Sequence, residues 1–287
     1  MKQRKVSQVV TGMRTWDGAG VKLTRVLGQD NVEDFDPFLM LDAFDSTNPE
    51  DYIAGFPWHP HRGIETVTYL IEGNIEHGDS IGNKGRITDG CCQWMTAGGG
   101  IMHQEMPKSS KHMLGAQLWI NLPQKDKMTA PAYNDIQAKD VIKIKEDGVK
   151  VAVVSGEYAG KKAAMQGNFV KTTYLDVTIE PGRTWSVKTP EENTVFAYIV
   201  LGSLEIDAKR YDNKRAILFD HGDTLSVTAG ADGARFLLLS AKPLGESIAW
   251  AGPIVMNTNE ELNQAFREIE EGTFVKDCKK AHLDFYR

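Results

Sequence analysis

Two short histidine motifs stand at a spacing that could bind a metal ion. His59 and His61 are separated by one residue, and His103 and Glu105 repeat that spacing further along the chain. Alternate side chains of a β-strand share a face, so each pair would point to one side of its own strand. Two such strands facing each other across a barrel would place three imidazoles and one carboxylate around a single ion. This ligand set is typical of a catalytic site with open coordination positions.

Glu65 is a second candidate for the carboxylate. It has the same parity as His59 and His61 if no bulge interrupts the strand. Spacing does not choose between Glu65 and Glu105, and the one that does not bind the ion would orient a ligand histidine. The remaining histidines have no partner at this spacing, and we interpret them as surface or capping residues: His77, His112, His221 and His282.

The proposed ligands contain no thiolate, so they suit Fe(II), Mn(II), Ni(II) or Cu(II) better than a thiolate-bound zinc ion. We expect one divalent ion per chain, namely Fe(II), with Mn, Ni, Cu and Zn as alternatives. The nearby run Gly98-Gly99-Gly100 lacks the Lys-Ser/Thr of a phosphate loop. It is better explained as a tight turn that delivers His103. Most of the large side chains beside the motifs are expected to pack in the core: Trp58, Trp94, Met95 and Met102.

The elements that must position these motifs are short strands. Runs such as ETVTYLIEG, AQLWINL and TVFAYIVLGSLEI are separated by Gly, Pro and Asp/Asn turns. Their spacing is typical of an all-β sandwich or barrel rather than of alternating βαβ units. The polar, turn-rich stretch from Pro123, PQKDKMTAPAYNDIQAKDVIKIKEDG, is interpreted as a connector with one short helix.

The two halves of the chain resemble each other. YLIEGNIE (69–76) matches YIVLGSLE (198–205) at an offset of 129, and Gly90 with Thr96-Ala97-Gly98 recurs at an offset of 132. Two matches in the same order favour an internal duplication. At these offsets none of the four ligands is retained, because His59, His61, His103 and Glu105 correspond to Lys188, Pro190, Arg235 and Leu237. The second half should therefore keep the architecture without the metal.

We predict two domains, a metal-binding barrel over residues 1–125 and a metal-free barrel over 126–287 that includes a terminal helix. The helix is indicated by the capping-box spacing of Thr258 and Glu261. Apolar residues then recur at i, i+4 and i+7 before Gly272, as in an amphipathic helix: Leu262, Phe266 and Ile269.

Composition favours an ordinary globular protein, with 41% hydrophobic and 25% charged residues. A net charge of −6 argues against a general electrostatic grip on nucleic acid. The start of the chain lacks the apolar segment of a signal peptide, and no run is long enough to span a bilayer, so we expect a cytoplasmic protein without membrane association. Cys91, Cys92 and Cys278 suggest no disulfide framework and are interpreted as small buried hydrophobes.

Four stretches closely resemble the pirins, a branch of the cupin superfamily: HPHRGIETVTYLIEG, QWMTAGGGIMHQEMP, AQLWINLP and GPIVMNTNEEL. The resemblance runs over nearly the whole chain and implies a bicupin, two antiparallel β-barrels (jelly-roll-like) with metal in the N-terminal one. It also implies that the ligands are His59, His61, His103 and Glu105, which favours Glu105 over Glu65. This chain departs from the pirin pattern at Asp89-Gly90-Cys91 and at Gly99, where substrate preference could change.

The resemblance implies two alternative functions. Pirin-like proteins include quercetin 2,3-dioxygenases, whose partners are an aromatic flavonol and dioxygen, and in such an enzyme Glu105 would be both ligand and catalytic base. Other pirins act as transcriptional cofactors or modulate a metabolic enzyme, which would require a protein partner. A third possibility is a cupin whose metal is structural. The sequence identifies neither the physiological substrate nor the oligomeric state.

Overall fold

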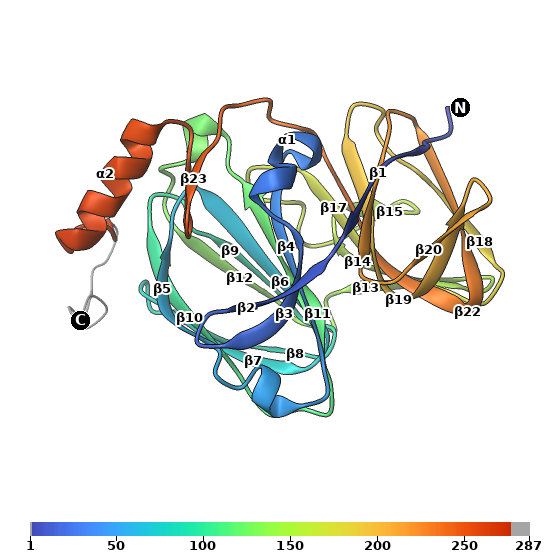
Figure 1. Cartoon of the computed structure of the whole chain (residues 1–287), viewed down its shortest axis with the longest axis horizontal. Coiled ribbons are helices and arrows are strands. Elements are labelled where there is room, and N and C mark those ends of the chain that lie inside the picture. The colour runs from blue at the N-terminus through green and yellow to red at the C-terminus, as the bar shows by residue number, and fades with distance from the viewer. Residues whose placement is uncertain (1, 277–287) are drawn as a thin grey trace. The chain divides into compact units, whose positions relative to one another are not determined.

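The computed structural model describes residues 2–276, and antiparallel strands make up most of them (Figure 1). The described chain divides into two units. One contains residues 14–25, 38–138 and 244–276 and is called the histidine unit below, because it carries the histidine motifs. The other contains residues 2–13, 26–37 and 139–243 and is called the nine-strand unit.

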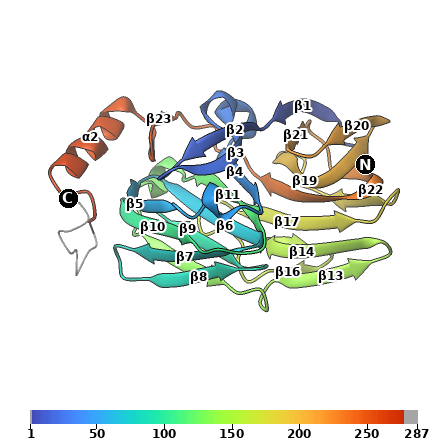
Figure 2. The ribbon, with the colours of Figure 1, turned by 60° about the horizontal axis from the view of Figure 1, so that its bottom comes forward.

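The histidine unit is built from two sheets, a hairpin and a helix. The seven-stranded sheet has the order β12 (Ala132–Ile136), β9 (Cys92–Thr96), β6 (Ile64–Glu72), β11 (Met113–Asn121), β4 (Phe38–Ser46), β3 (Val21–Leu27) and β2 (Met13–Asp17). The four-stranded sheet has the order β5 (Phe56–His61), β10 (Ile101–Pro107), β7 (Asn74–Asp79) and β8 (Lys84–Thr88), and all four strands are labelled in Figure 2. The remaining elements are β23 (Ala249–Ala251), β24 (Ile254–Met256), α2 (Asn259–Glu270) and the 3-10 helices η2 (Pro49–Asp51) and η3 (Gln124–Asp126).

The nine-strand unit is a single sheet with a small hairpin. Its main path is β1 (Val6–Thr11), β21 (Arg215–Phe219), β19 (Thr194–Ile206), β22 (Thr224–Ala241), β17 (Thr172–Ile179), β14 (Val149–Ser155) and β13 (Ile142–Glu146). Two strands join it from the side, namely β18 (Thr184–Lys188) on β22 and β20 (Lys209–Asp212) on β19. The other elements are the hairpin β15 (Glu157–Tyr158) and β16 (Lys161–Lys162), η1 (Gln29–Asn31) and α1 (Val32–Phe35).

Each unit buries one face of its strands in its own core. In the nine-strand unit alternate residues such as Val195, Ala197 and Ile199 of β19 pack together. In the histidine unit Leu70, Phe44 and Ile87 belong to one cluster, and a second cluster joins α2 to the β23–β24 hairpin. The all-β prediction is therefore confirmed. Among residues 2–276, no helix combines the length and apolar character needed to cross a bilayer.

The predicted terminal helix is confirmed as α2. Thr258 Oγ1 accepts from the Glu261 amide, and the Glu261 carboxylate accepts from the Thr258 amide, which completes the capping box. Leu262 is buried, and Phe266 and Ile269 pack against the same cluster. The apolar stripe read from the sequence thus faces the β23–β24 hairpin of the histidine unit.

The two units exchange chain ends, which differs from the expected division between residues 125 and 126. Strand β1 pairs with β21 in the nine-strand unit, while residues 244–276 belong to the histidine unit. The polar stretch from Pro123 is not a plain connector, since it contains η3 and two strands. Of these, β12 pairs with β9 and completes the histidine unit, whereas β13 pairs with β14. Both β12 and β13 are edge strands. Edge strands carry polar residues, so the sequence pattern did not indicate a strand at either place.

Cys91 and Cys92 are buried, as expected, whereas Cys278 and His282 lie outside the described residues. Burial raises the pKa of the Cys92 thiol, and the neighbouring charges of Cys91 and Asp135 raise it further. In a Cys278→Ser variant we therefore expect no alkylation by iodoacetamide at pH 8 while the protein is folded. Intact mass should show two additions after guanidinium unfolding. Labelling of the folded variant at the same rate as the unfolded one would contradict the burial.

Candidate metal centre

Three histidines converge on one point of the four-stranded sheet. Strand β5 carries His59 and His61, and its antiparallel partner β10 places His103 directly opposite His59. One ring nitrogen from each histidine lies within 4.8 Å of the other two. Among residues 2–276 this is the one group of three such side chains found at metal-binding distance. The two histidine motifs therefore do meet, on neighbouring strands rather than on strands facing across a barrel.

Backbone carbonyls fix the orientation of two of these rings. His59 Nδ1 lies 2.8 Å from the Pro57 carbonyl oxygen, and His61 Nδ1 lies 3.1 Å from that of Pro253. A carbonyl can only accept, so each Nδ1 carries the proton, and in the neutral ring Nε2 keeps its lone pair. The two Nε2 atoms are 3.0 Å apart. Two neutral rings would thus present facing lone pairs, an arrangement that a shared cation stabilises.

His103 supplies the clearest sign that the histidine cluster fits a metal ion. It is fully buried, and neither of its ring nitrogens has a hydrogen-bond partner among the described residues. Burial lowers the pKa of both His103 and His61 well below the usual range, and nearby imidazoles lower it further. Both rings are therefore neutral and can ligate. Buried polar atoms without partners are rare, and coordination would satisfy one of them.

The glycine run before His103 forms the tight turn that was predicted. Gly98 and Gly100 have φ values of +52° and +137°, and the Gly100 amide donates to the Ala97 carbonyl. A Cβ on Gly98 would lie 2.1 Å from the Thr129 carbonyl oxygen. The turn thus needs both the conformational freedom and the small size of glycine, and β10 begins immediately after it.

Glu105 lies close to the histidines but is not part of the group at ligand distance. Its carboxylate is buried, with Oε1 accepting from Thr68 Oγ1 at 3.0 Å and Oε2 from Gln117 Nε2 at 2.7 Å. Gln117 is itself held, since its Oε1 accepts from Trp119 Nε1. Each carboxylate oxygen keeps a second lone pair for a metal ion or a proton. The role of Glu105 as fourth ligand remains a proposal.

Glu65 does not share the face of the histidines. Strand β5 ends at His61, Gly63 turns the chain at φ +77°, and β6 belongs to the other sheet, so parity is not carried from His61 to Glu65. Within β6, Glu65 and Thr68 have opposite parity, and Thr68 is the residue that contacts Glu105. Glu65 instead accepts a hydrogen bond of 2.7 Å from Thr96 Oγ1. The parity argument for Glu65 was therefore wrong.

His77 was wrongly interpreted as a surface residue. It is buried on β7 directly opposite Glu105 in the ladder, and its ring centroid lies 5.4 Å from that of His103. Gln93 Nε2 lies 3.0 Å from its Nδ1, and its ring stacks on Tyr133 at 4.8 Å. The i, i+2 spacing of His77 and Asp79 was the available signal. Most flanking side chains are buried as expected, Trp94, Met95 and Met102, whereas Trp58 is 37% exposed.

The segment from residue 244 onward contacts the candidate metal centre and the residue next to it. Besides the contact from Pro253 to His61, the buried Arg62 forms a salt bridge of 2.6 Å with Glu268 of α2. Arg62 also donates to the Phe274 carbonyl, and its guanidinium lies 4.3 Å from the Phe274 ring centroid. The residue next to a candidate ligand is thus fixed by the C-terminal helix.

Glu268 should make this support sensitive to acid. Burial alone would raise its pKa, but hydrogen bonds from Lys276, Arg62 and Gln264 outweigh burial and lower it to about 2. A folded-state pKa below the unfolded value of 4.5 means that Glu268 stabilises the protein above pH 4.5 and loses this effect as the pH falls toward 2. We expect Glu268→Gln to lower the free energy of unfolding by about 2 kcal/mol at pH 6, and clearly less at pH 3. Denaturant titrations at both pH values measure this, and an equal loss at both would contradict it.

The strand ladders confirm one repeat match and correct the other. The offset of 129 relates β6 and β7 to β19, with Gly73 and Gly202 both at positive φ. The offset of 132 is wrong, because Thr96 lies on β9 whereas Thr228 lies on β22. Glu76 lies opposite Met106, and its counterpart Glu205 lies opposite Thr228. Residues of β10 therefore correspond to residues at the start of β22 at a sequence offset of 122. Chance similarity of small residues produced the second match.

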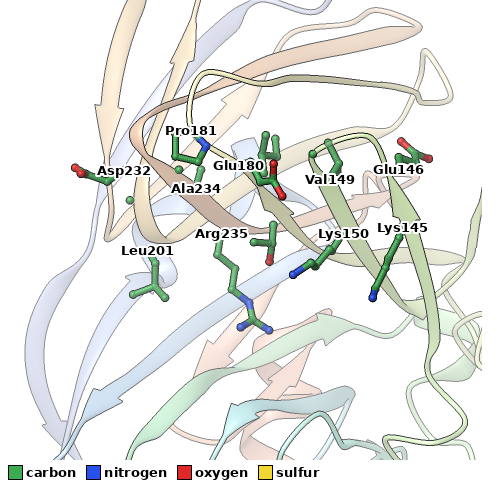
Figure 3. A pocket seen from close by; sticks show the side chains of 15 residues that line it. Lys145, Glu146, Val149, Lys150, Glu180, Pro181, Leu201, Asp232, Ala234 and Arg235 are labelled. Carbon is green, nitrogen blue, oxygen red and sulfur yellow. The ribbon is translucent and has the colours of Figure 1, made fainter.

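The corrected register also replaces the predicted counterparts of the ligands. In the strand ladders His103 lies opposite His59, and Leu225 lies opposite Val187 in the same way. The ladder then continues with a hydrogen bond from the Thr189 amide to the Asp223 carbonyl oxygen. His59, His61, His103 and Glu105 therefore correspond to Val187, Thr189, Leu225 and Val227. Arg235 lies on the other face of β22, in the hollow of Figure 3, and forms an ion pair with Asp176. These four counterparts include no histidine and no acidic residue, so the prediction that the second half retains none of the four ligands is confirmed.

Comparisons with known proteins agree with this architecture. The family model described as Pirin matches residues 20–120, and the one described as Pirin C-terminal cupin domain matches residues 174–275. A solved quercetin 2,3-dioxygenase from Acinetobacter baumannii superimposes with a TM-score of 0.86 and 32% identity, covering 95% of this chain and 98% of that one. Two cupin-type units of antiparallel strands, one with a histidine cluster, define a bicupin.

Within the bicupins, this chain belongs to the pirin family. A pirin-like protein from Caulobacter vibrioides is 42% identical over 277 residues, which cover 96% of this chain and 100% of that protein. Human pirin is 38% identical over 278 residues, with 94% of both chains covered. The family resemblance seen in the four sequence stretches is thus confirmed.

Proposed function

We propose that this pirin is a metal-dependent dioxygenase that opens flavonols of the quercetin type. His59, His61, His103 and Glu105 would hold one Fe(II) ion. The observation that carries the proposal is the meeting of three imidazoles around a point where neither ring nitrogen of His103 has a hydrogen-bond partner among residues 2–276. The similarity to a solved quercetin 2,3-dioxygenase over nearly the whole chain supports the choice of reaction.

The bound ion would supply sites for a flavonol oxygen and for dioxygen and would acidify the flavonol hydroxyl. Glu105 would receive the hydroxyl proton. The hydrogen bonds from Thr68 and Gln117 support this role, because each uses only one lone pair of a carboxylate oxygen. Trp119 Nε1 in turn fixes the Gln117 amide. This chain of donors fixes the orientation of the Glu105 carboxyl group.

Substrate would approach from the side of His59. His61 and His103 are almost fully buried, whereas His59 is partly exposed and follows the exposed Trp58. An exposed aromatic side chain beside the cluster suits contact with a flat aromatic ligand. The deeper histidines are shielded from water, which strengthens their interaction with charge at the centre.

The test is oxygen consumption by Fe(II)-loaded protein with quercetin as the probe substrate, together with release of carbon monoxide. Turnover should depend on both metal and flavonol and should disappear in His61→Ala. His112→Ala is the matched control, since His112 contacts Asp45 and Glu72 away from the cluster. Iron-loaded protein that retains one ion per chain but consumes no oxygen would overturn the proposed reaction. Protein that never retains metal would overturn the centre itself.

A further inference from the structure

A cavity of about 520 Å³ occupies the nine-strand unit. The buried Leu175 and Leu238 and the partly buried Val187 supply its apolar lining. Thr173 and Ser240 add hydroxyl groups, and exposed residues, among them Lys188, form its rim. Its volume falls within the range of about 300–1,000 Å³ found for small-molecule sites, which are mainly apolar with a few placed polar groups.

The strand register places this cavity at the position of the metal centre in the other unit. Trp119 lies between Thr66 and Met40 in its ladder, just as Ser240 lies between Val195 and Thr173. The Trp119 ring packs against His61 at a centroid distance of 4.9 Å. In the nine-strand unit serine replaces this tryptophan, and Val187 stands where His59 would be. Open volume therefore occupies the position at which the histidine unit has its histidine cluster and the Trp119 indole.

Buried contacts hold the rim of the cavity in place. Arg4 is almost fully buried and donates from its guanidinium to Thr189 Oγ1 and to the carbonyls of Pro190, Glu191, Asn193 and Asp220. On the hairpin side, Tyr158 accepts from Trp185 Nε1 and donates to Glu146. A cavity with fixed walls binds a ligand at a lower entropic cost than one that must be ordered first.

The lining defines the chemistry of a ligand. Ser240 Oγ accepts a hydrogen bond from Asn193 Nδ2 at 3.0 Å, so its own hydrogen is available to a ligand acceptor. Lys188 places a positive charge at the rim. Two acidic side chains lie near this charge. Glu157 on the rim is paired with Lys162, whose Nζ lies 3.8 Å from its carboxylate. The Asp223 carboxylate, which the charge of Lys188 also reaches, accepts hydrogen bonds from the Lys2 amide and from Thr224 Oγ1.

We propose that this cavity binds a small organic monoacid, with its apolar body among Leu175, Val187 and Leu238 and its carboxylate toward Lys188. The site would be independent of metal and of the dioxygenase reaction. The first half of the duplication would then serve chemistry and the second half ligand recognition.

Calorimetric titration of the full chain with 3-phenylpropanoate tests the proposal, with the neutral 3-phenylpropanamide as the matched probe. We expect the acid to bind about fivefold more tightly than the amide, the ratio that an ion pair of about 1 kcal/mol produces. Lys188→Gln should remove this preference. Lys209→Gln should retain it, because Lys209 lies on β20 at the other end of β19. Equal affinities for acid and amide in the wild type, or no binding of either, would overturn the proposal.

Filling the cavity gives a second test. Ser240→Trp restores the residue found at the corresponding position of the histidine unit and should abolish binding while leaving metal content unchanged. If circular dichroism shows that this variant does not fold, Thr173→Met makes the smaller matched change, after Met40. His61→Ala should bind the acid as the wild type does. Binding that survives the filled cavity, or that disappears in His61→Ala, would assign the acid to another site and overturn the proposal.

Discussion

A His103→Leu variant should lose the metal and yet be more stable than the wild-type protein measured without metal. Both effects follow from the same observation, that His103 is buried with neither ring nitrogen hydrogen-bonded within the described chain. Loss of a residue that merely supports a ligand weakens metal binding by about 10–100-fold, so loss of a ligand should exceed about 100-fold. Replacing an unsatisfied buried polar group by an apolar one of similar size should stabilise the metal-free protein by about 1–3 kcal/mol.

Metal content by elemental analysis and denaturant unfolding in chelator measure the two effects separately. His112→Leu is the control, because His112 is partly exposed and contacts Asp45 at 3.0 Å. It should leave metal content unchanged and should not stabilise the chelated protein. A His103→Leu protein that keeps its metal would remove His103 from the centre. A destabilised metal-free variant would contradict the conclusion that the unpaired ring nitrogens of His103 cost stability.

Gly63→Ala should destabilise the protein by more than about 3 kcal/mol and reduce metal retention. Gly63 has φ +77°, and a Cβ there would lie 1.9 Å from the Val255 carbonyl oxygen, which is backbone and cannot rotate away. The same turn is held by Lys127, whose Nζ donates to the carbonyls of Gly63 and Val255. A shift of this turn would move His61, which ends β5 two residues earlier.

Gly82→Ala provides the matched control. Gly82 also has positive φ, at +96°, but no atom lies within 4 Å of a Cβ built on it. Its substitution should therefore cost only the conformational strain, about 1 kcal/mol. Denaturant titration and elemental analysis of both variants separate the effect of the positive φ angle from that of the contact between the new Cβ and the Val255 carbonyl oxygen. Equal losses in the two variants would show that the contact with Val255 does not matter.

Local spacing was sufficient to predict which side chains of each motif share a face, whereas the pairing of β5 with β10 that brings the histidines together was not readable. The i, i+2 pairs of His59 with His61 and His103 with Glu105 depend only on strand alternation, which holds over these two short stretches. The Gly98-Gly99-Gly100 turn and the α2 capping box were also readable, because both are decided by residues that are neighbours in sequence.

Features that depend on strand partners were not readable. The parity argument for Glu65 failed because a positive-φ turn at Gly63 separates two sheets. His77 looked unpartnered because its neighbours Gln93 and Tyr133 arrive on other strands. The counterparts of His103 and Glu105 were misplaced because ladder register, not sequence similarity, relates the two halves.

The exchange of chain ends has a consequence for biosynthesis. The Pro253 carbonyl that orients His61, and the Glu268 and Phe274 groups that hold Arg62, belong to the last stretch of the described chain. At roughly 5–20 residues per second, a ribosome would need on the order of ten seconds after making Glu105 to reach Phe274. During that interval the three imidazoles would exist without their supporting carbonyl and helix. Metal acquisition should therefore follow the synthesis of residues 253–274, which metal content of pulse-labelled nascent chains of different lengths would test.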